Sequence, residues 1–240
     1  MEKDGKKIKH YPNGKIGDIR YYKNGEIDGI WEKFWENGNK DSVIEMKEGV
    51  YHGKWTNYYE NGNIKSIRNY KNGECDEKTI SYYENGNVEI EDNGKDDTNW
   101  EKKWYYENGQ VSHHIQDKKH IKYHQNGNKS SEWMVNENNN LDGLHLSYYK
   151  NGQKHYEENL KDGKKEGMSI WYHDNGSIFS KNLFVNEKLH GEILRYDKNE
   201  NLTDRLNYIN GKLHGKWICY LPDGTIKKEE YYEDGKLIGK

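Results

Sequence analysis

The sequence contains little proline, cysteine or aliphatic residue, and it has no long apolar run. Its 240 residues include only 2 Pro and 2 Cys. No stretch approaches the 18 or more apolar residues of a membrane-spanning helix, and the first residues hold no hydrophobic segment like that of a signal peptide. We therefore expect a cytoplasmic protein, or an exported or surface-attached one if a leader segment has been removed.

Charge of one sign is also missing, because the formal net charge is only -3. A balanced chain lacks the basic stripe that nucleic acids and anionic membranes usually require, so we expect no nucleic-acid partner. The two cysteines, Cys75 and Cys219, lie six repeats apart, which predicts that they form no intrachain disulfide.

Aromatic residues and turn formers are abundant. The chain has 21 Tyr, 8 Trp and 3 Phe, which supply most of its apolar surface, and 25 Gly together with many Asn. Aromatic side chains favour strands, and Gly and Asn favour tight turns. This composition predicts an all-β protein.

A repeat of about 24 residues organises the chain. Segments of the type YYENGN recur with a glycine, here called the tip glycine, and Glu200 takes its place once; the positions are Gly14, Gly38, Gly62, Gly86, Gly109, Gly127, Gly152, Gly176, Glu200 and Gly224. A second turn series falls between them, at Gly25, Gly49, Gly73, Gly163, Gly211 and Gly235, with Glu187 in one slot. A β-hairpin cannot bury enough surface alone, so the units must stack.

The predicted fold is an all-β, elongated antiparallel β-hairpin array, a solenoid or meander of about ten 24-residue units. We expect one repeat domain over residues 1–240, with an irregular, shortened unit around residues 94–126 and a kink there. Both ends of the sequence fall inside a unit, and exposed edge strands predict end-to-end self-association.

The turn residues predict which side chains face each other. Pro12-Asn13-Gly14 suits a type I turn followed by a left-handed glycine at a bulge, which pairs the fourth residue before the tip glycine with the second after it. Tyr58 then meets Ile64. Period-2 alternation extends this predicted core face backwards to positions such as Ile80 and Ile218, and forwards to positions such as Tyr22, Met46, Tyr70 and Tyr232.

The patterns Tyr-Tyr-x-Asn-Gly-x-Ile, Tyr-x-Asn-Gly and Gly-x-Trp resemble the MORN-repeat variant, most closely at residues 53–64 and 215–220. The resemblance implies a β-hairpin repeat without catalytic activity or cofactor. It also implies kinship with bacterial YwqK-like proteins described as antitoxins of toxin–antitoxin systems, or with scaffolds. Other MORN proteins are associated with membrane lipid, which the balanced charge of this chain does not support.

No residue constellation predicts catalysis or metal binding. His52, His190 and His214 share one repeat position, so the two in neighbouring units lie about 10 Å apart, whereas metal-bound nitrogens each lie about 2 Å from the ion. His120 and His124 share a face but span about 13 Å of strand. Carboxylates follow the repeat, and the glycines belong to hairpin turns. We expect no catalytic site, no metal and no cofactor.

The face opposite the predicted core is the candidate binding surface. The plain structural interpretation is that its rings only cover the sheet. The functional interpretation is a protein partner, since Tyr and Trp are enriched in binding hot spots. The candidate partner-binding residues are Trp31, Trp35, Trp55, Tyr59, Tyr83, Trp104, Tyr106 and Tyr149.

Two functions from different classes follow. The first is a non-enzymatic protein–protein interaction module, with an antitoxin that binds and occludes a toxin as its specific form. The alternative is a cell-envelope or surface structural protein that contacts membrane lipid or glycan.

Overall fold

The computed structural model describes residues 4–75, 78–94 and 100–240, and all regular secondary structure in them is β-strand. The chain divides into two compact units, unit 1 (Met1–Asp117) and unit 2 (Lys118–Lys240). Unit 1 contains β1 (Gly5–His10), β2 (Ile16–Lys23), β3 (Glu26–Ile27), β4 (Gly29–Phe34), β5 (Lys40–Lys47), β6 (Val50–Tyr58), β7 (Ile64–Lys71), β8 (Glu74–Cys75), β9 (Thr79–Tyr82), β10 (Val88–Asp92), β11 (Glu101–Tyr105) and β12 (Val111–Gln116).

Unit 2 has the same construction. It contains β13 (Lys119–Tyr123), β14 (Lys129–Met134), β15 (Gly143–Tyr148), β16 (Lys154–Lys161), β17 (Lys164–Tyr172), β18 (Ile178–Val185), β19 (Lys188–Leu189), β20 (Gly191–Tyr196), β21 (Leu202–Ile209), β22 (Lys212–Leu213), β23 (Gly215–Tyr220), β24 (Ile226–Glu233) and β25 (Lys236–Gly239).

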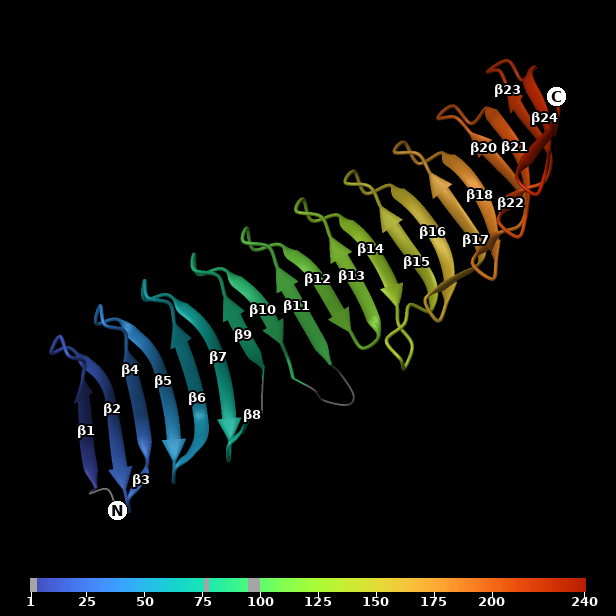
Figure 1. Cartoon of the computed structure of the whole chain (residues 1–240). Coiled ribbons are helices and arrows are strands. Elements are labelled where there is room, and N and C mark those ends of the chain that lie inside the picture. Colours follow the sequence, from blue (N-terminus) through green and yellow to red (C-terminus); the bar gives the residue numbers. More distant parts are fainter. Residues whose placement is uncertain (1–3, 76–77, 95–99) are drawn as a thin grey trace. The chain divides into compact units, whose positions relative to one another are not determined.

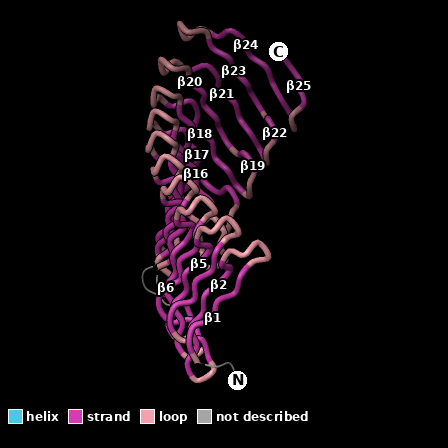
Figure 2. Tube along the Cα trace, turned by 90° about the vertical axis from the view of Figure 1, so that its left-hand side faces the viewer, coloured by secondary structure: helices cyan, strands magenta, loops and turns pink. Residues whose placement is uncertain are grey.

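Each unit is an open antiparallel sheet in which strands adjacent in sequence lie side by side (Figure 1). The hairpin tips of unit 2 stack along one edge of its sheet (Figure 2). The predicted all-β antiparallel hairpin array is therefore confirmed within each unit. The prediction of a single repeat domain stays a prediction.

The hairpin tips have the predicted bulged register. In the tip after β6, Gly62 has φ +91°, its N–H donates to the Tyr59 carbonyl at 2.9 Å, and Tyr58 pairs with Ile64. The corresponding pairs occur at the other tips, with a register shift each time. The Pro-Asn-Gly pattern therefore identifies the turn correctly.

The second turns are tighter. At Asn24-Gly25 both residues have positive φ, +53° and +84°, and the flanking Lys23 and Glu26 pair directly. This is the two-residue hairpin turn for which Asn-Gly is favoured. Glu187 occupies the predicted slot with φ +64°, so an ordinary side chain there bears the strain that glycine avoids.

The irregular unit falls at the boundary between units 1 and 2. The second turn of this unit, which the sequence pattern does not reveal, lies at Asp117. This residue has φ +53° and directly follows β12. Residues 95–99 of the predicted irregular segment lie outside the described residues. The predicted kink stays a prediction.

The bulge makes the predicted core face partly wrong. Its extra residue reverses the alternation after the tip, so Tyr70 and Tyr232 lie with tryptophans on the opposite face. Ring centroids are 5.7 Å apart between Trp55 and Tyr70 and 6.1 Å apart between Trp217 and Tyr232. We call this side the Trp face and the side of Tyr58 the Tyr face.

The Trp face is also the more buried one, contrary to the prediction. Ile44 on that face is 1% exposed, whereas Ile30 on the Tyr face is 39% exposed. Small side chains explain the difference, because buried serines let the large rings close over them. Trp171 Nε1 lies 3.1 Å from Ser169 Oγ, to which it donates a hydrogen bond. Other buried Trp-face residues are Ser42, Met46, Ser66, Ile115, Glu158, Ser180, Ile193, Leu206 and Glu230.

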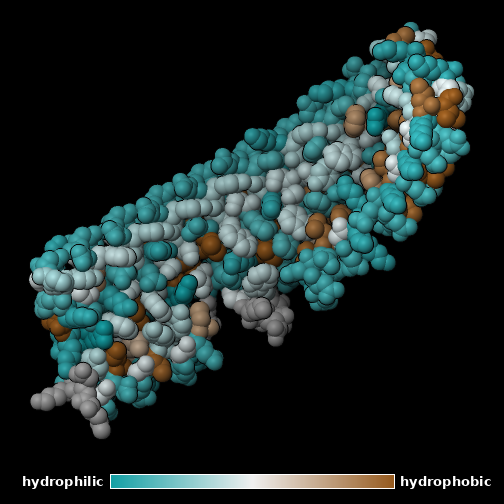
Figure 3. Space-filling model, viewed as in Figure 1, coloured by the Kyte–Doolittle hydropathy of each residue, from teal (hydrophilic) through white to brown (hydrophobic). Residues whose placement is uncertain are grey.

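Exposed apolar side chains lie elsewhere. They occupy mainly the Tyr face and the sheet edges, and the surface in view in Figure 3 shows them as small separate areas among hydrophilic residues. All six residues of β1 are exposed, and its outer edge has no partner strand among the described residues. End-to-end association through this edge stays a prediction.

Candidate functional site

A ladder of side-chain hydrogen bonds links successive hairpin tips. The residue three before the tip glycine is here called the ladder residue, and at six tips it donates to the carbonyl beside the next tip. Tyr59 Oη lies 2.7 Å from the Tyr82 oxygen, and Tyr83 Oη lies 2.7 Å from the Tyr105 oxygen. Tyr11 and Tyr149 make the same bond at 2.7 and 2.8 Å. The hydroxyl groups of these four tyrosines, of which Tyr59, Tyr83 and Tyr149 are candidate residues, therefore hold neighbouring repeats together.

Histidine substitutes for tyrosine at two ladder positions of unit 2. His124 Nε2 lies 3.1 Å from the Tyr148 carbonyl oxygen, and His173 Nε2 lies 2.9 Å from the Tyr196 carbonyl oxygen. In each case the ring nitrogen must carry the proton, because a carbonyl oxygen only accepts. A ring of this reach with a donor at its end makes the ladder bond, which explains the Tyr-His exchange in the repeat, whereas Trp35, Asp197 and Leu221 hold the same position without making it.

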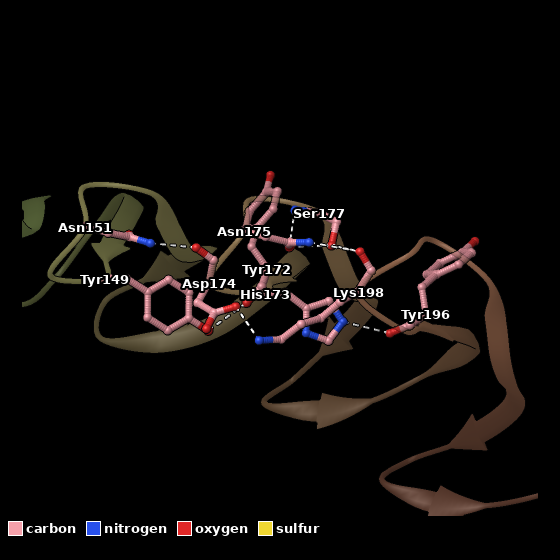
Figure 4. Close-up of polar contacts among 9 residues, drawn as sticks. All are labelled: Tyr149, Asn151, Tyr172, His173, Asp174, Asn175, Ser177, Tyr196 and Lys198. Atoms are coloured by element: carbon pink, nitrogen blue, oxygen red, sulfur yellow. Dashed lines mark hydrogen bonds and ion pairs between the residues drawn. The ribbon is translucent and has the colours of Figure 1, made fainter.

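Asparagines form a second row beside the hydroxyl ladder. Asn37 and Asn39 donate through Nδ2 to the Glu60 carbonyl at 3.0 and 2.7 Å, and the Asn37 carboxamide oxygen accepts the Asn39 N–H at 2.8 Å. Figure 4 shows both rows in unit 2, where Asn151 and Asn175 donate to the carbonyls of the following tips. The Asn-Gly-Asn motif therefore shapes each turn and also ties it to the next.

The Trp face of unit 1 carries the remaining candidates in separate groups. Trp55 lies against Tyr51 and Tyr70, with ring centroids 5.0 and 5.7 Å away. Trp31 lies under two cations, since the Arg20 guanidinium and the Lys33 ammonium are 4.6 and 4.4 Å from its ring centre.

Trp104 forms the third group. Its ring stacks on His113 at 4.9 Å, and the Lys102 ammonium lies 5.0 Å from the Trp104 ring centre. The groups at Trp31 and Trp104 combine an aromatic ring with cations, whereas the group at Trp55 consists of rings alone.

The electrostatics of the tip edge favour neutral phenols. Burial, and then the nearby carboxylates Glu89 and Glu84, raise the pKa of Tyr59. Burial together with Glu89 and Glu107 does the same for the pKa of Tyr83. Both phenols therefore keep their protons over the physiological range and act as donors.

Unit 2 has a continuous aromatic row on its Trp face. It crosses five strands, from His120 through Trp133, His145 and Tyr156 to Trp171, with successive ring centroids 5.0, 5.9, 5.4 and 4.9 Å apart. Burial lowers the pKa of His120 and of His145, so both rings are mainly neutral at pH 7.

A buried acid lies next to this row. The Glu158 carboxylate is 3.5 Å from His145 Nδ1 and 2.7 Å from Lys165 Nζ. The residue is only 6% exposed, so these two nitrogens offset part of its desolvation. His145 is the histidine that approaches this acid. Within the described ranges, no three His, Cys, Asp or Glu side chains are placed to hold a metal ion.

The predicted site residues do not form one cluster. The ladder positions Trp35, Tyr59, Tyr83 and Tyr106 line the tip edge of unit 1, and Tyr149 lies at a tip of unit 2. The tryptophans at 31, 55 and 104 lie on the Trp face of unit 1. All eight candidates are half-buried.

Sequence reasoning missed the ladder acceptors and the buried Glu158. The ladder was detectable in part, because a hydroxyl or imidazole recurs at one position of a 24-residue period. Its carbonyl partners could be found only from the distances between repeats.

The fold and these contacts define an open β-hairpin repeat module, in which one edge and one face carry rows of polar and aromatic groups. The sequence pattern of the MORN repeat variant matches residues 27–48, 51–72, 78–96, 101–115, 141–162, 165–186 and 213–234. These matches cover more than half of the chain, which therefore belongs to the MORN repeat variant family. Repeats of this family are non-catalytic and commonly act as protein- or membrane-interaction modules.

Solved structures share only a loose likeness. One is a crystal structure of TcdB2–TccC3 with Cdc42, with 11% identity and a TM-score of 0.23 over 94% of this chain and 15% of that chain. Another is a crystal structure of TcdB2–TccC3, with 10% identity and a TM-score of 0.21 over 95% of this chain. A Photorhabdus luminescens Tc holotoxin pore gives the same values. The chain spans about 15% of the length of these matches.

A search of curated proteins finds no match. In the described part of the chain, no helix has the length and apolar character needed to cross a membrane.

Proposed function

We propose that this chain is a non-enzymatic protein-interaction module that binds a partner protein through the Trp face and tip edge of unit 1. The supporting observation is the arrangement at Trp31, a half-buried indole with Arg20 and Lys33 against its ring at 4.6 and 4.4 Å. Trp, Tyr and Arg are the residue types that carry most of the binding energy in protein interfaces. Seven of the eight candidate residues belong to unit 1.

The specific form of the proposal is an antitoxin that neutralises a toxin by occluding its active surface. The family resemblance supports this form. An antitoxin that acts by occlusion needs no catalytic group. This agrees with a repeat whose polar side chains form the hydrogen bonds of the ladder.

The test is capture of partner proteins from a lysate of the source organism on the immobilised full chain. Wild type is compared with a double variant, Trp31→Ala and Trp35→Ala, in which no ladder hydroxyl is lost. Ile30→Ala is the matched control, because Ile30 neighbours Trp31 in β4 but lies on the Tyr face. One small protein retained near one-to-one by wild type and by Ile30→Ala, and lost with the double variant, is expected. Equal capture by the double variant would remove this surface from consideration.

The toxin form has its own test. Co-expression of the captured protein without the chain should arrest growth, and co-expression with wild type should restore it. A captured protein that leaves growth unaffected would exclude the antitoxin form and keep the interaction module.

A second candidate function rests on the aromatic row from His120 to Trp171 in unit 2. Rows of rings with polar neighbours can stack against sugars, so this row supports the alternative of an envelope or surface protein that contacts glycan. Retention of the chain on a polysaccharide column, and its loss on Tyr156→Ala, would support this function. Passage of the wild-type chain without delay over a panel of cell-wall polysaccharides would exclude it.

A further inference from the structure

Three tyrosines on the Tyr face donate a hydrogen bond to a glutamate of the preceding hairpin. Tyr148 Oη lies 2.7 Å from Glu132 Oε1, and Tyr172 Oη lies 2.6 Å from Glu157 Oε1, both in unit 2. In unit 1 the Tyr105 hydroxyl bonds Glu91 at 2.8 Å. Each glutamate is the fifth residue after its tip glycine, a place that we call the acceptor position. The repeat therefore contains a carboxylate site that the chain fills itself.

The next two hairpins of unit 2 keep the tyrosine but change the partner. Lys181 and Arg205 stand at the acceptor position, beside Tyr196 and Tyr220. The strand register is unchanged, because Lys181 pairs with Leu194 and Arg205 pairs with Ile218, as Glu157 pairs with Ile170 in the hairpin before. At these two places a cation therefore replaces the carboxylate that accepts the phenol proton.

These donors have few partners. Within residues 100–240 the phenols of Tyr196 and Tyr220 and the Lys181 ammonium find no hydrogen-bond acceptor, and the Tyr196 phenol points away from the ladder bonds (Figure 4). Arg205 Nε lies 3.3 Å from Glu192 Oε1, in a pair whose side chains are 48% and 54% exposed. Such an exposed ion pair contributes little and exchanges readily.

Two surface notches open at these tyrosines. The first has a volume of 240 Å³ and is lined by Ile178, Lys181, Tyr196 and Glu200. The second, of 280 Å³, is lined by Leu202, Tyr220 and Pro222 together with Asn201, Asp223 and Gly224.

Two acids border the notches. Glu200 is exposed at the tip. The Asp223 carboxylate is held by its own turn, where the Thr225 N–H and hydroxyl donate to it at 2.9 and 2.6 Å. The first notch offers the Tyr196 phenol, the Lys181 ammonium and an aliphatic wall, and the second offers the Tyr220 phenol and aliphatic walls. Arg205 lies outside the lining of the second notch, at the acceptor position of the same hairpin as Leu202.

We propose that these two notches bind two carboxylate side chains of a partner protein. The inference rests on the proposed interaction function and names a second surface and the chemistry of its ligand. The same fold binds a carboxylate at this place three times with its own glutamates, and two places in unit 2 present instead a phenol and a cation that both favour an anion.

The spacing specifies the partner further. The two sites lie two hairpin strands of the repeat apart, about 10 Å. Carboxylates at residues i and i+7 of an α-helix are separated by about 10.5 Å on one face. Leu202 lies between the two sites, and Ile178 lies beside the first one. Both side chains suit contact with apolar residues at positions i+3 and i+4 of the bound helix. The ligand is thus an acidic amphipathic helix lying across the strands.

The probe is a hydrocarbon-stapled helical peptide with Glu at i and i+7 and Leu at i+3 and i+4, titrated against the full chain. The test variant combines Lys181→Glu and Arg205→Glu, which rebuilds the internal Tyr–Glu pair of the preceding hairpins and so preserves the fold. The matched control combines Lys188→Glu and Lys212→Glu, with the same charge change at exposed positions near the second turns. A peptide with Gln at both acidic positions tests the carboxylates.

We expect the test variant to weaken peptide binding at least about tenfold, and the control variant to change it less than about twofold. Tyr196→Phe with Tyr220→Phe should give an intermediate loss. Equal binding of the Gln peptide, equal binding by the test variant, or no binding by wild type up to millimolar peptide would each overturn the proposal.

These experiments distinguish a failure of the notch proposal from a failure of the proposed function. A partner captured through Trp31 and Trp35 that binds the Lys181→Glu, Arg205→Glu variant at full affinity would leave the interaction module standing and reject the notches. Peptide binding at the notches without any captured partner would do the reverse.

Discussion

Removal of a single ladder hydroxyl should loosen one repeat from the next without changing the shape of the side chain. Tyr59→Phe deletes the bond of 2.7 Å from the phenol to the Tyr82 carbonyl and leaves the ring in place. A neutral hydrogen bond contributes about 1 kcal/mol net to stability, and a partly buried carbonyl loses its partner in addition. We expect the free energy of unfolding to fall by about 1 to 1.5 kcal/mol.

Tyr58→Phe is the matched control. Tyr58 precedes Tyr59 in the chain and is equally half-buried, but its phenol has no hydrogen-bond partner among the described residues. Its removal should change stability by less than about 0.5 kcal/mol, as is usual for substitutions that break no such feature. The two variants therefore differ in one hydrogen bond.

The assay is urea unfolding followed by tryptophan fluorescence, with the melting temperature from calorimetry as a second measure. A loss of about 1 kcal/mol corresponds to a fall of about 3–5 °C for a unit of this size. A double variant with Tyr83→Phe should lose about twice as much, because the two bonds lie at separate junctions. If Tyr58→Phe and Tyr59→Phe destabilise equally, the ladder does not contribute in the way described.

Three further predictions follow from the strands and the Tyr–Glu pairs. Ile44→Ala should cost about 2–4 kcal/mol in urea unfolding and Ile30→Ala less than about 1, and equal costs would contradict the burial of the Trp face. Gly53→Ala should cost more than about 1 kcal/mol, since Gly53 has φ +101° and an added Cβ would overlap a carboxylate of the neighbouring strand; an unchanged midpoint would refute this strain. Burial and the Glu157 hydrogen bond raise the pKa of Tyr172 to about 12, so this stabilisation is complete below about pH 10 and is lost as the pH rises through 12. A tyrosinate absorbance titration should place Tyr172 among the last steps, together with Tyr105 and Tyr148, which also donate to glutamates, and Glu157→Gln should move the Tyr172 step toward pH 10.

The hairpins and their register could be predicted because both depend on local chemistry. Asn-Gly and Pro-Asn-Gly determine the turn type, and the turn type determines that Tyr58 faces Ile64. The relation of the two faces could not be obtained in the same way. One extra residue at the bulge reverses the alternation, so Tyr70 joins Trp55, and the error affected every strand that follows a tip.

The candidate site was less predictable than the fold. The aromatic residues were visible in the sequence, but the role of the Tyr59 hydroxyl depends on the distance to a carbonyl 23 residues away. The exchange of Glu157 for Lys181 at the acceptor position is visible in the sequence once the repeats are aligned. Its meaning required the three Tyr–Glu contacts, which only the folded repeat brings together.

The tip ladder also determines how unit 2 should respond to force. His173 and Asn175 bond the tip that carries Tyr196 and Lys198, but in the fully described range 100–240 no side chain of residues 197–201 bonds the tip at residues 221–225. Pulled from Lys240 in an optical trap, the chain should unzip hairpin by hairpin, and the last hairpin should release at the lowest force. Each earlier hairpin of unit 2 should then unfold with an extension step of similar length at a higher force. Unit 2 would therefore lengthen in stages as the load rises.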